Sequence, residues 1–393
     1  MKTVPKRFYV FGAGSLCNDD ASVDGYKHIR LPLVRVLDKF GFEMVWVGFT
    51  RQNKVKNHHL STIGLHAPEW LDDVRDVMRD DGSEMTDLAL HSDDPEIAAR
   101  MRNRISKKPG VLLVELRPDL SKAGYAFKKE FDAQLSLIKC FFELNLPVII
   151  WDMDVWSQHL PRWVQERAVL CRAYCEPAEG QFARETELLF GWHRYWPWWE
   201  NKIAELAKMP KLFDVSYCGN VSNRREEFGS FFEPFHSADM SVCIQGNWLR
   251  SKYGDRDFSL DQFPRFMFFG EAGHWSALPT LARSKCTIHF SSAAQRKAGM
   301  PTVRIWEAAM GRSLAFCFEG IRHIDRFVPE EFIVSDGQDA LERWKRIDTN
   351  GSWSDMHELF AKKVKNTEHS YDARARTLID VIVDHYGIDW KIE

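Results

Sequence analysis

The sequence predicts an α/β protein built from two doubly wound domains with a central cleft between them. Short apolar runs with the composition of strands alternate with helical segments in the first half of the chain, and the alternation restarts in the second half. This pattern predicts parallel sheets covered by helices on both faces. The length of 393 residues agrees, because a single hydrophobic core stops growing at roughly 250–300 residues.

In the first half, strands are expected at four apolar runs, and helices where apolar residues recur at helical spacing. The expected strands are residues 8–12, 43–47, 111–116 and 148–151. The expected helices are residues 26–40, which Gly41 closes, and residues 127–142, with charged surface helices within 68–109. Strands and helices in this order are typical of a doubly wound sheet.

The same order returns in the second half. Strands are expected at residues 213–217, 241–245, 286–290, 314–318 and 332–334, and a helix at 303–310. Pro197 limits helix within the stretch 191–204, which favours a connection there. We expect a first domain over 1–170, a linker over 171–200, a second domain over 201–370, and a segment 371–393 whose helix (373–386) packs back on the first domain.

Composition and charge narrow the class of protein. Hydrophobic residues make up 45% of the chain and charged residues 28%, as in soluble globular proteins. The net charge of −3 provides no global field toward nucleic acid or anionic membranes. The eight cysteines lie mostly in apolar runs, which predicts buried thiols in a reducing compartment. No apolar run reaches the roughly 18 residues of a membrane span, so we expect a soluble, cytoplasmic protein, in the host cytoplasm if it is viral.

A glycine-rich loop, Gly12-Ala13-Gly14-Ser15, follows the first expected strand. A dinucleotide-binding fingerprint would need a third glycine where Cys17 stands, and an acidic residue at the end of the second strand. The loop therefore favours either a tight strand-to-helix turn or a close approach by a sugar or phosphate. Under the second interpretation, Gly14 and Ser15 are candidate ligand contacts.

Two carboxylates, Asp152 and Asp154, follow the strand at 148–151 and are expected at the carboxyl edge of the first sheet. A carboxylate in a cleft can act as a general base. An Asp-x-Asp pair can also hold Mg²⁺ or Mn²⁺ bound to a sugar diphosphate, because these cations prefer carboxylate oxygens. The alternative without chemistry is a helix N-cap with a solvated neighbour.

Two pairs of charged residues mark strand-to-helix junctions in the second half. Arg224 and Arg225 follow a strand and a glycine turn, where a helix N-terminus and two guanidinium groups suit a phosphate. Arg304 and Glu307, three residues apart, can face one site and bind a diphosphate and a ribose. The alternatives are pairing of Arg224 and Arg225 with Glu226 or Glu227, and an internal Arg304–Glu307 pair.

Several motifs resemble the phage DNA β-glucosyltransferase family. The stretch TVRIWEAAM is similar to that family's T-L-R-V-W-E-T-M, and FDVSYCGNVSNRRE, SVCIQGNW and HRYWPWWEN resemble further motifs in the same order across about residues 190–345. In the first half the resemblance is weaker and includes PVIIWDMDVWSQ. The family's acidic residue of the first helix falls near residues 28–30, where this chain has no carboxylate.

The resemblance implies a GT-B fold, a UDP-sugar donor with UDP-glucose as the first choice, inversion at the sugar carbon, and a monomer. It places Asp154, with Asp152 as the alternative, as the catalytic base. For the donor, it implies that the diphosphate is bound by Arg304, Arg225 and Arg224, and that the ribose is bound by Glu307. The backbone at Gly219, Asn220 and Gly246 would also approach the donor, and the main chain at Glu271 and Ala272 would contact the uracil. A Mg²⁺ or Mn²⁺ ion is a further candidate, as an aid to product release.

The implied acceptor is double-stranded DNA with a hydroxymethylated pyrimidine, either hydroxymethylcytosine or hydroxymethyluracil. The first domain would then bind DNA, with the basic loop 51–59 and residues 102–108 holding phosphates. Three alternatives remain open: a UDP-sugar transferase acting on a polysaccharide, protein or small molecule; a nicotinamide oxidoreductase using the Gly12–Gly14 loop; and a nucleotide-binding protein without turnover. The alternative for the basic loop is a solvated surface turn.

Overall fold

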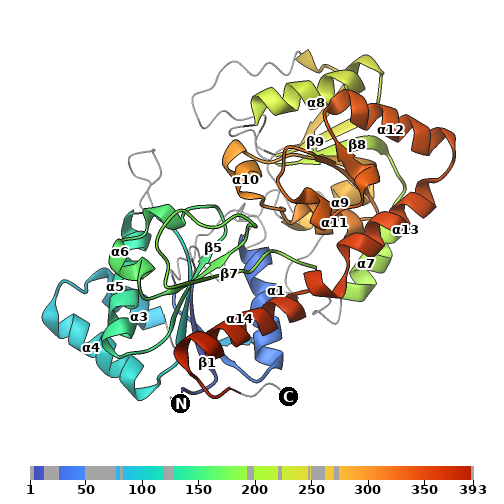
Figure 1. Cartoon of the computed structure of the whole chain (residues 1–393). Coiled ribbons are helices and arrows are strands. Elements are labelled where there is room, and N and C mark those ends of the chain that lie inside the picture. Colours follow the sequence, from blue (N-terminus) through green and yellow to red (C-terminus); the bar gives the residue numbers. More distant parts are fainter. Residues whose placement is uncertain are drawn as a thin grey trace.

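The chain forms two lobes, each built on a parallel sheet with helices on both faces (Figure 1). The computed structural model describes residues 4–12, 26–48, 77–79, 83–118, 128–192, 199–219, 224–246, 248, 262–269 and 274–390. Within these residues the first sheet has the strand order β3-β2-β1-β4-β5-β6-β7, and the second has the order β10-β9-β8-β11-β12-β13.

The first lobe takes its sheet from the amino-terminal half of the chain. Its strands are β1 (Arg7–Phe11), β2 (Glu43–Trp46), β3 (Met78–Arg79), β4 (Val111–Glu115), β5 (Val148–Asp152), β6 (Val169–Arg172) and β7 (Arg184–Glu187). Its helices are α1 (Tyr26–Lys39), α3 (Ser83–Leu90), α4 (Pro95–Lys107), α5 (Lys128–Glu143) and α6 (Arg162–Gln165), with the 3₁₀ turn η3 (Ser157–His159).

Alternate residues of the buried strands serve the two faces of the first sheet. In β1, Phe8 and Val10 belong to one apolar cluster together with residues of α1, and Tyr9 and Phe11 belong to another together with residues of α5. This is the period of two that a strand imposes on its side chains. Both faces are covered, which explains why the strand sequences are apolar throughout.

The second lobe repeats the arrangement. Its strands are β8 (Phe213–Cys218), β9 (Val242–Gln245), β10 (Met267–Phe269), β11 (Ser284–His289), β12 (Leu314–Phe318) and β13 (Ile333–Val334). Its helices are α7 (Trp199–Ala207), α8 (Arg225–Ser237), α9 (His274–Ala282), α10 (Ala293–Ala298), α11 (Arg304–Met310), α12 (Gly337–Thr349) and α13 (Trp353–Val364), with η6 (Ile324–Arg326) and η7 (Glu330–Phe332). Helix α8 packs beside α12, and α9 beside α11.

The chain returns to the first lobe through η8 (Thr367–His369) and α14 (Tyr371–Tyr386), which packs against α1 and β6 (Figure 1). The Tyr386 hydroxyl donates to the Val148 carbonyl at 2.8 Å, and the Trp390 indole N–H donates to the Val4 carbonyl at 2.7 Å. The Trp390 ring also packs against Phe8. The last segment thus closes the first lobe's core.

The doubly wound α/β prediction is confirmed, and most expected elements lie within a few residues of the observed ones. The strands β3, β6, β7 and β10 were not expected; β3 lies within 68–109, where only surface helices were expected. Because β7 pairs with β6, the first sheet continues to Glu187, inside the segment 171–200 expected as the linker. Seven of the cysteines lie in described residues and are buried free thiols, as expected. Among the described helices, none combines the length and the apolar character that crossing a membrane requires.

Candidate functional site

Asp152 and Gly219, both singled out in the sequence, lie at the carboxyl ends of β5 and β8, and two further polar residues end β9 and β11. Asp152 ends β5, Gln245 ends β9 and His289 ends β11, while Gly219 follows β8. Because the strands of each sheet are parallel, their carboxyl ends share one edge, where ligands of doubly wound folds bind. The candidate site is built from these two edges.

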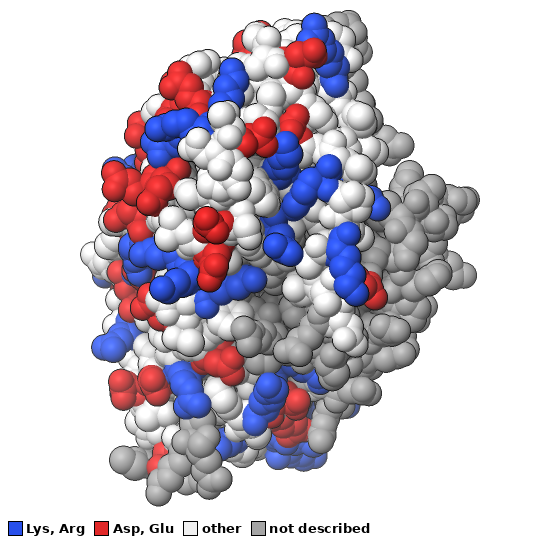
Figure 2. Space-filling model, turned by 90° about the vertical axis from the view of Figure 1, so that its right-hand side faces the viewer, with Lys and Arg blue, Asp and Glu red and all other residues white. Residues whose placement is uncertain are grey.

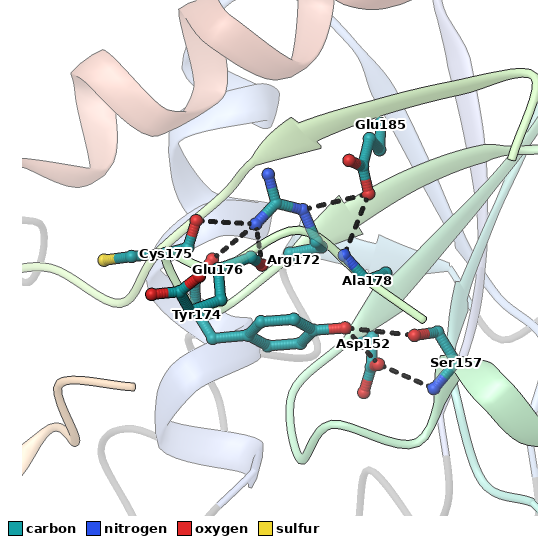
Figure 3. Close-up of polar contacts among 8 residues, drawn as sticks. All are labelled: Asp152, Ser157, Arg172, Tyr174, Cys175, Glu176, Ala178 and Glu185. Atoms are coloured by element: carbon teal, nitrogen blue, oxygen red, sulfur yellow. Dashed lines mark hydrogen bonds and ion pairs between the residues drawn. The ribbon is translucent and has the colours of Figure 1, made fainter. Parts of the chain in front are cut away.

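Asp152 holds the turn that follows β5. Its buried carboxylate accepts a hydrogen bond from the backbone N–H of Trp156 at 2.9 Å. It also accepts from the Ser157 N–H at 2.7 Å and from the Tyr174 hydroxyl at 2.9 Å (Figure 3). Burial, together with the nearby charge of Asp152, raises the pKa of Tyr174. The phenol therefore stays protonated, and its O–H group donates a hydrogen bond to Asp152. The Asp152 carboxylate therefore stabilises the turn through these hydrogen bonds, and we keep only Asp154 as the candidate base.

The backbone of this turn is strained. Val155 has a φ of +62°, a left-handed conformation that a β-branched residue rarely adopts. The hydrogen bonds from Trp156 and Ser157 to Asp152 hold it in place. Strain of this kind, of order 1–3 kcal/mol, persists where the surroundings over-determine the conformation, and it clusters at functional sites.

Asp154 points from the first lobe to the second. Its side chain is partly buried, and its Oδ1 accepts a hydrogen bond from Gln295 Nε2 at 3.2 Å. The Gln295 Oε1 accepts in turn from Arg224 Nη2 at 3.5 Å. Asp154 and Arg224, each expected to face the ligand, are thus separated by one side chain.

Arg304 and Glu307 form the internal ion pair that the sequence left as an alternative. Arg304 Nη1 contacts Glu307 Oε2; the Glu307 side chain is 1% exposed and that of Arg304 is 31% exposed. The Arg304 side chain is therefore partly exposed to solvent, and its ion pair with the buried Glu307 carboxylate fixes its position. The pair does not exclude ligand binding, because a guanidinium group has further N–H donors.

The other alternative was pairing of Arg224 and Arg225 with Glu226 or Glu227, and the described side chains test it only for Arg224 and Glu227. Glu227 pairs with Arg296 at 2.6 Å. The side chains of Arg225 and Glu226 lie outside the described residues, as do Asn220, Glu271, Ala272, Gly14, Ser15 and the loop 51–59.

His289, which lies close enough to Arg224 and Arg304 to be influenced by their charges, was not anticipated. It is buried at the end of β11, and its Nε2 has no hydrogen-bond partner among the described residues. Burial, and then the charges of Arg224 and Arg304, lowers the pKa of His289 to about 3. A neutral imidazole leaves the two guanidinium groups as the cations of the site.

Neutral burial of His289 predicts acid sensitivity. The unfolded chain takes up this proton near pH 6.5 and the folded chain only near pH 3, so the free energy of unfolding falls as the pH drops through that window. Urea unfolding of the His289→Gln variant between pH 4 and 6 should show a slope smaller by ~1.4 kcal/mol per pH unit than the wild type. The exposed His159, changed in the same way, is the control; equal slopes for wild type and His289→Gln would contradict the assignment.

Two glycine turns touch at the edge of the second sheet. Gly246 has a φ of +150°, and a Cβ there would lie 1.9 Å from the Gly219 carbonyl oxygen. The same oxygen accepts from the Trp248 indole N–H at 2.8 Å. Glycine at 246 is therefore required by the protein's own backbone, whether or not a donor also approaches it.

Gly246→Ala should lower the free energy of unfolding by at least ~3 kcal/mol, because the left-handed strain and the overlap with Gly219 add together. Gly229→Ala is the matched control. A Cβ at Gly229, inside α8, meets nothing within 4 Å, so that change should stabilise the protein by ~0.5–1 kcal/mol. Thermal unfolding of the two variants beside the wild type measures both effects, and equal stabilities would overturn the account of Gly246.

The first glycine of the Gly12–Gly14 loop is also explained by internal packing. A Cβ at Gly12 would lie 2.3 Å from the Trp46 ring and 2.8 Å from the Arg30 guanidinium group. Arg30 is buried against Trp46 and pairs through Nη2 with Glu115 Oε2 at 2.5 Å. This pair fills the space beside the first strand's end, which favours the tight-turn interpretation over a dinucleotide loop.

The basic segment 102–108 lies at the wrong end of the sheet for the expected phosphate contacts. It covers the end of α4, which Figure 1 labels, directly before β4. It therefore lies at the amino edge of the sheet, whereas Asp154 follows the carboxyl end of β5. Arg102 pairs with Glu143 at 3.1 Å, and Arg104 pairs with Glu84. On the face shown in Figure 2, Lys and Arg are interspersed with Asp and Glu.

A divalent cation held by Asp152 and Asp154 does not fit this geometry. Asp152 uses its oxygens for the hydrogen bonds of its own turn. The Asp-x-Asp metal interpretation is therefore not retained.

Two parallel, doubly wound lobes agree with the expected GT-B fold, and comparison with solved structures supports it. Solved structures of similar fold include the phage T4 β-glucosyltransferase (TM-score 0.57, 11% identity, 96% of this chain and 99% of that chain). Others are Anabaena HepE bound to UDP-glucose (0.57, 10%, 96% and 99%) and a glycosyltransferase from Rickettsia africae (0.61, 10%, 97% and 98%). No family model and no curated protein matches the sequence.

Proposed function

We propose that the protein is an inverting glycosyltransferase that moves a sugar from a UDP-sugar to a hydroxyl group. One observation carries the proposal: Gln295 contacts both Asp154 of the first lobe and Arg224 of the second, so a candidate base faces a candidate diphosphate site. The similarity to UDP-glucose complexes of the T4 and Anabaena enzymes supports this class of donor.

In the proposed reaction, the Asp154 carboxylate takes the proton of the acceptor hydroxyl as its oxygen bonds to the sugar C1. The bond from C1 to the diphosphate oxygen breaks, and UDP leaves with the electron pair. A single displacement inverts the configuration at C1. Negative charge grows on the diphosphate in the transition state, where the preplaced guanidinium groups of Arg304 and Arg224 stabilise it.

The remaining donor contacts are proposals that rest on the resemblance. Glu307 accepts hydrogen bonds from the ribose and also fixes Arg304 through their ion pair. The other proposed contacts are Arg225, Asn220, Gly219, Gly246, Glu271, Ala272, Gly14 and Ser15. A Mg²⁺ or Mn²⁺ ion that aids release of UDP is a further proposal, and the T4 enzyme's complex with UDP and Mn²⁺ supports the presence of such an ion. We propose that it arrives with the diphosphate rather than on an Asp152–Asp154 pair, because Asp152 is engaged in its own turn.

As acceptor we propose a hydroxymethylated pyrimidine in double-stranded DNA. The resemblance, and the similarity to a β-glucosyltransferase described as a DNA-modifying enzyme, support it. The target base would have to leave the duplex to reach Asp154. The position of 102–108 at the opposite edge favours the alternative of a polysaccharide, protein or small-molecule acceptor.

Incubating a panel of UDP-sugars with hydroxymethylated DNA, unmodified DNA and oligosaccharides tests both the proposed enzyme class and the proposed acceptor. Mass spectrometry of the nucleosides detects a transferred sugar, and release of UDP measures turnover on any acceptor. We expect UDP release with at least one acceptor, and a sugar on the hydroxymethylated base. Turnover only with other acceptors would overturn the DNA proposal; NAD binding without UDP binding would overturn the class.

A further inference from the structure

Helix α10 is short, but both of its ends contact the first lobe. Figure 1 places it on the side of the second lobe that faces β5. At its start, Ser292 and Gln295 form a capping box, in which each side chain binds the other residue's backbone N–H. At its end, the carbonyls of Ala298 and Gly299 accept from the N–H groups of Glu176 at 3.0 Å and Cys175 at 3.2 Å.

The first-lobe loop that receives the end of α10 also supports Asp152. Arg172 Nη1 donates to the carbonyls of Tyr174 at 3.1 Å and Cys175 at 2.9 Å, which fixes the loop's shape (Figure 3). Tyr174 in the same loop donates to Asp152. The turn that carries Asp154 and the helix that carries Gln295 are therefore held by one rigid unit.

The Gln295 carboxamide has a defined orientation. Its Oε1 accepts from the Ser292 N–H at 3.2 Å and from Arg224 at 3.5 Å, so its Nε2 is directed to Asp154. An N–H donor favours the ionised form of a carboxylate. The same contact fixes the carboxylate relative to Arg224 without adding a charge beside it.

We propose that Gln295 is a positioning residue that holds Asp154 in its basic form and aligned with the donor diphosphate; this role rests on the proposed function. Glutamine is suited to it because one carboxamide donates to a base and accepts from a phosphate-binding arginine. A glutamate at 295 would satisfy the capping box equally well but would place a second carboxylate against Asp154.

Because glutamate keeps the cap but changes the charge beside Asp154, substitutions can distinguish a positioning role of Gln295 from a role in capping helix α10. The variants are Gln295→Glu, Gln295→Met, and Ser292→Ala, which removes the cap and keeps the glutamine side chain. Each is measured for thermal unfolding, UDP affinity and the pH profile of kcat/KM. We expect Gln295→Met to lower kcat/KM by about 3- to 10-fold, the loss of one hydrogen bond, and to move the acid limb to higher pH.

For Gln295→Glu we expect unfolding close to wild type and an acid limb higher by about one pH unit or more, because a like charge disfavours ionisation. Ser292→Ala should lower thermal stability and leave the acid limb in place. An acid limb of Gln295→Glu equal to that of wild type would overturn the positioning role alone. A wild type that binds no UDP and transfers no sugar would overturn the proposed function first, and the positioning role with it.

Discussion

Replacing Asp154 with asparagine is expected to lower kcat for sugar transfer by ~10²–10⁴-fold, the usual contribution of a general base. Asparagine keeps an oxygen that can accept from Gln295, so the contact between the lobes survives. UDP affinity should therefore stay within about threefold of wild type, because the lost function is proton transfer rather than donor binding. Rates of UDP release with and without acceptor, and calorimetry with UDP, measure the two quantities.

Asp152→Asn is the matched control. It removes the charge that receives the backbone N–H groups of Trp156 and Ser157, so it should cost about 2–3 kcal/mol of unfolding free energy. Its activity should fall through loss of the turn, with a loss of stability that Asp154→Asn does not share. A variant at Asp154 that transfers sugar at near wild-type rate, beside an inactive but stably folded Asp152→Asn protein, would reverse the assignment.

The sequence predicted most of the strands on which burial imposes an apolar pattern, although the buried strand β6, VLCR, was not expected. Strand β4 is buried along its whole length, and its sequence, VLLVE, stands out from its surroundings. Strand β7, RETE, lies half-exposed at the edge of the sheet, where pairing is a matter of backbone hydrogen bonds and the side chains need not be apolar. No sequence pattern distinguishes such a strand from a polar loop, and it fell inside the expected linker.

The site was readable as far as single strand ends allow. Asp154 and Arg224 each follow a strand, and parallel topology brings strand ends together. Arg304, expected at a strand-to-helix junction, instead begins α11 directly after α10 and a short connection. The sequence could not predict that Asp152 stabilises the turn while Asp154 is the candidate base. Asp152 accepts from Tyr174, which lies 22 residues further along the chain. Gln295 was missed for the same reason. Its partner Asp154 is 141 residues away, although the Ser-x-x-Gln capping pattern was visible.

Replacing Arg304 with glutamine should have a comparably large effect on catalysis, through the leaving group instead of the base. The neutral side chain no longer stabilises charge on the departing diphosphate, so kcat should fall by ~10²–10³-fold and UDP should bind more weakly. The change also leaves the Glu307 carboxylate, 1% exposed, without the guanidinium group that pairs with its Oε2. We expect the free energy of unfolding to fall by about 3 kcal/mol. This value lies at the lower end of the cost of breaking a buried ion pair, because Arg304 is partly exposed.

The double variant Arg304→Gln with Glu307→Gln separates the two effects. Removing both charges takes away the buried carboxylate together with its partner, and replacing a whole buried pair is far less costly than breaking it. Stability should therefore return most of the way to wild type, while sugar transfer stays as slow as in Arg304→Gln. Recovery of transfer along with stability would mean that Arg304 acts only by holding Glu307, and the diphosphate would then have to be bound by Arg224 and residues beyond the described part of the chain.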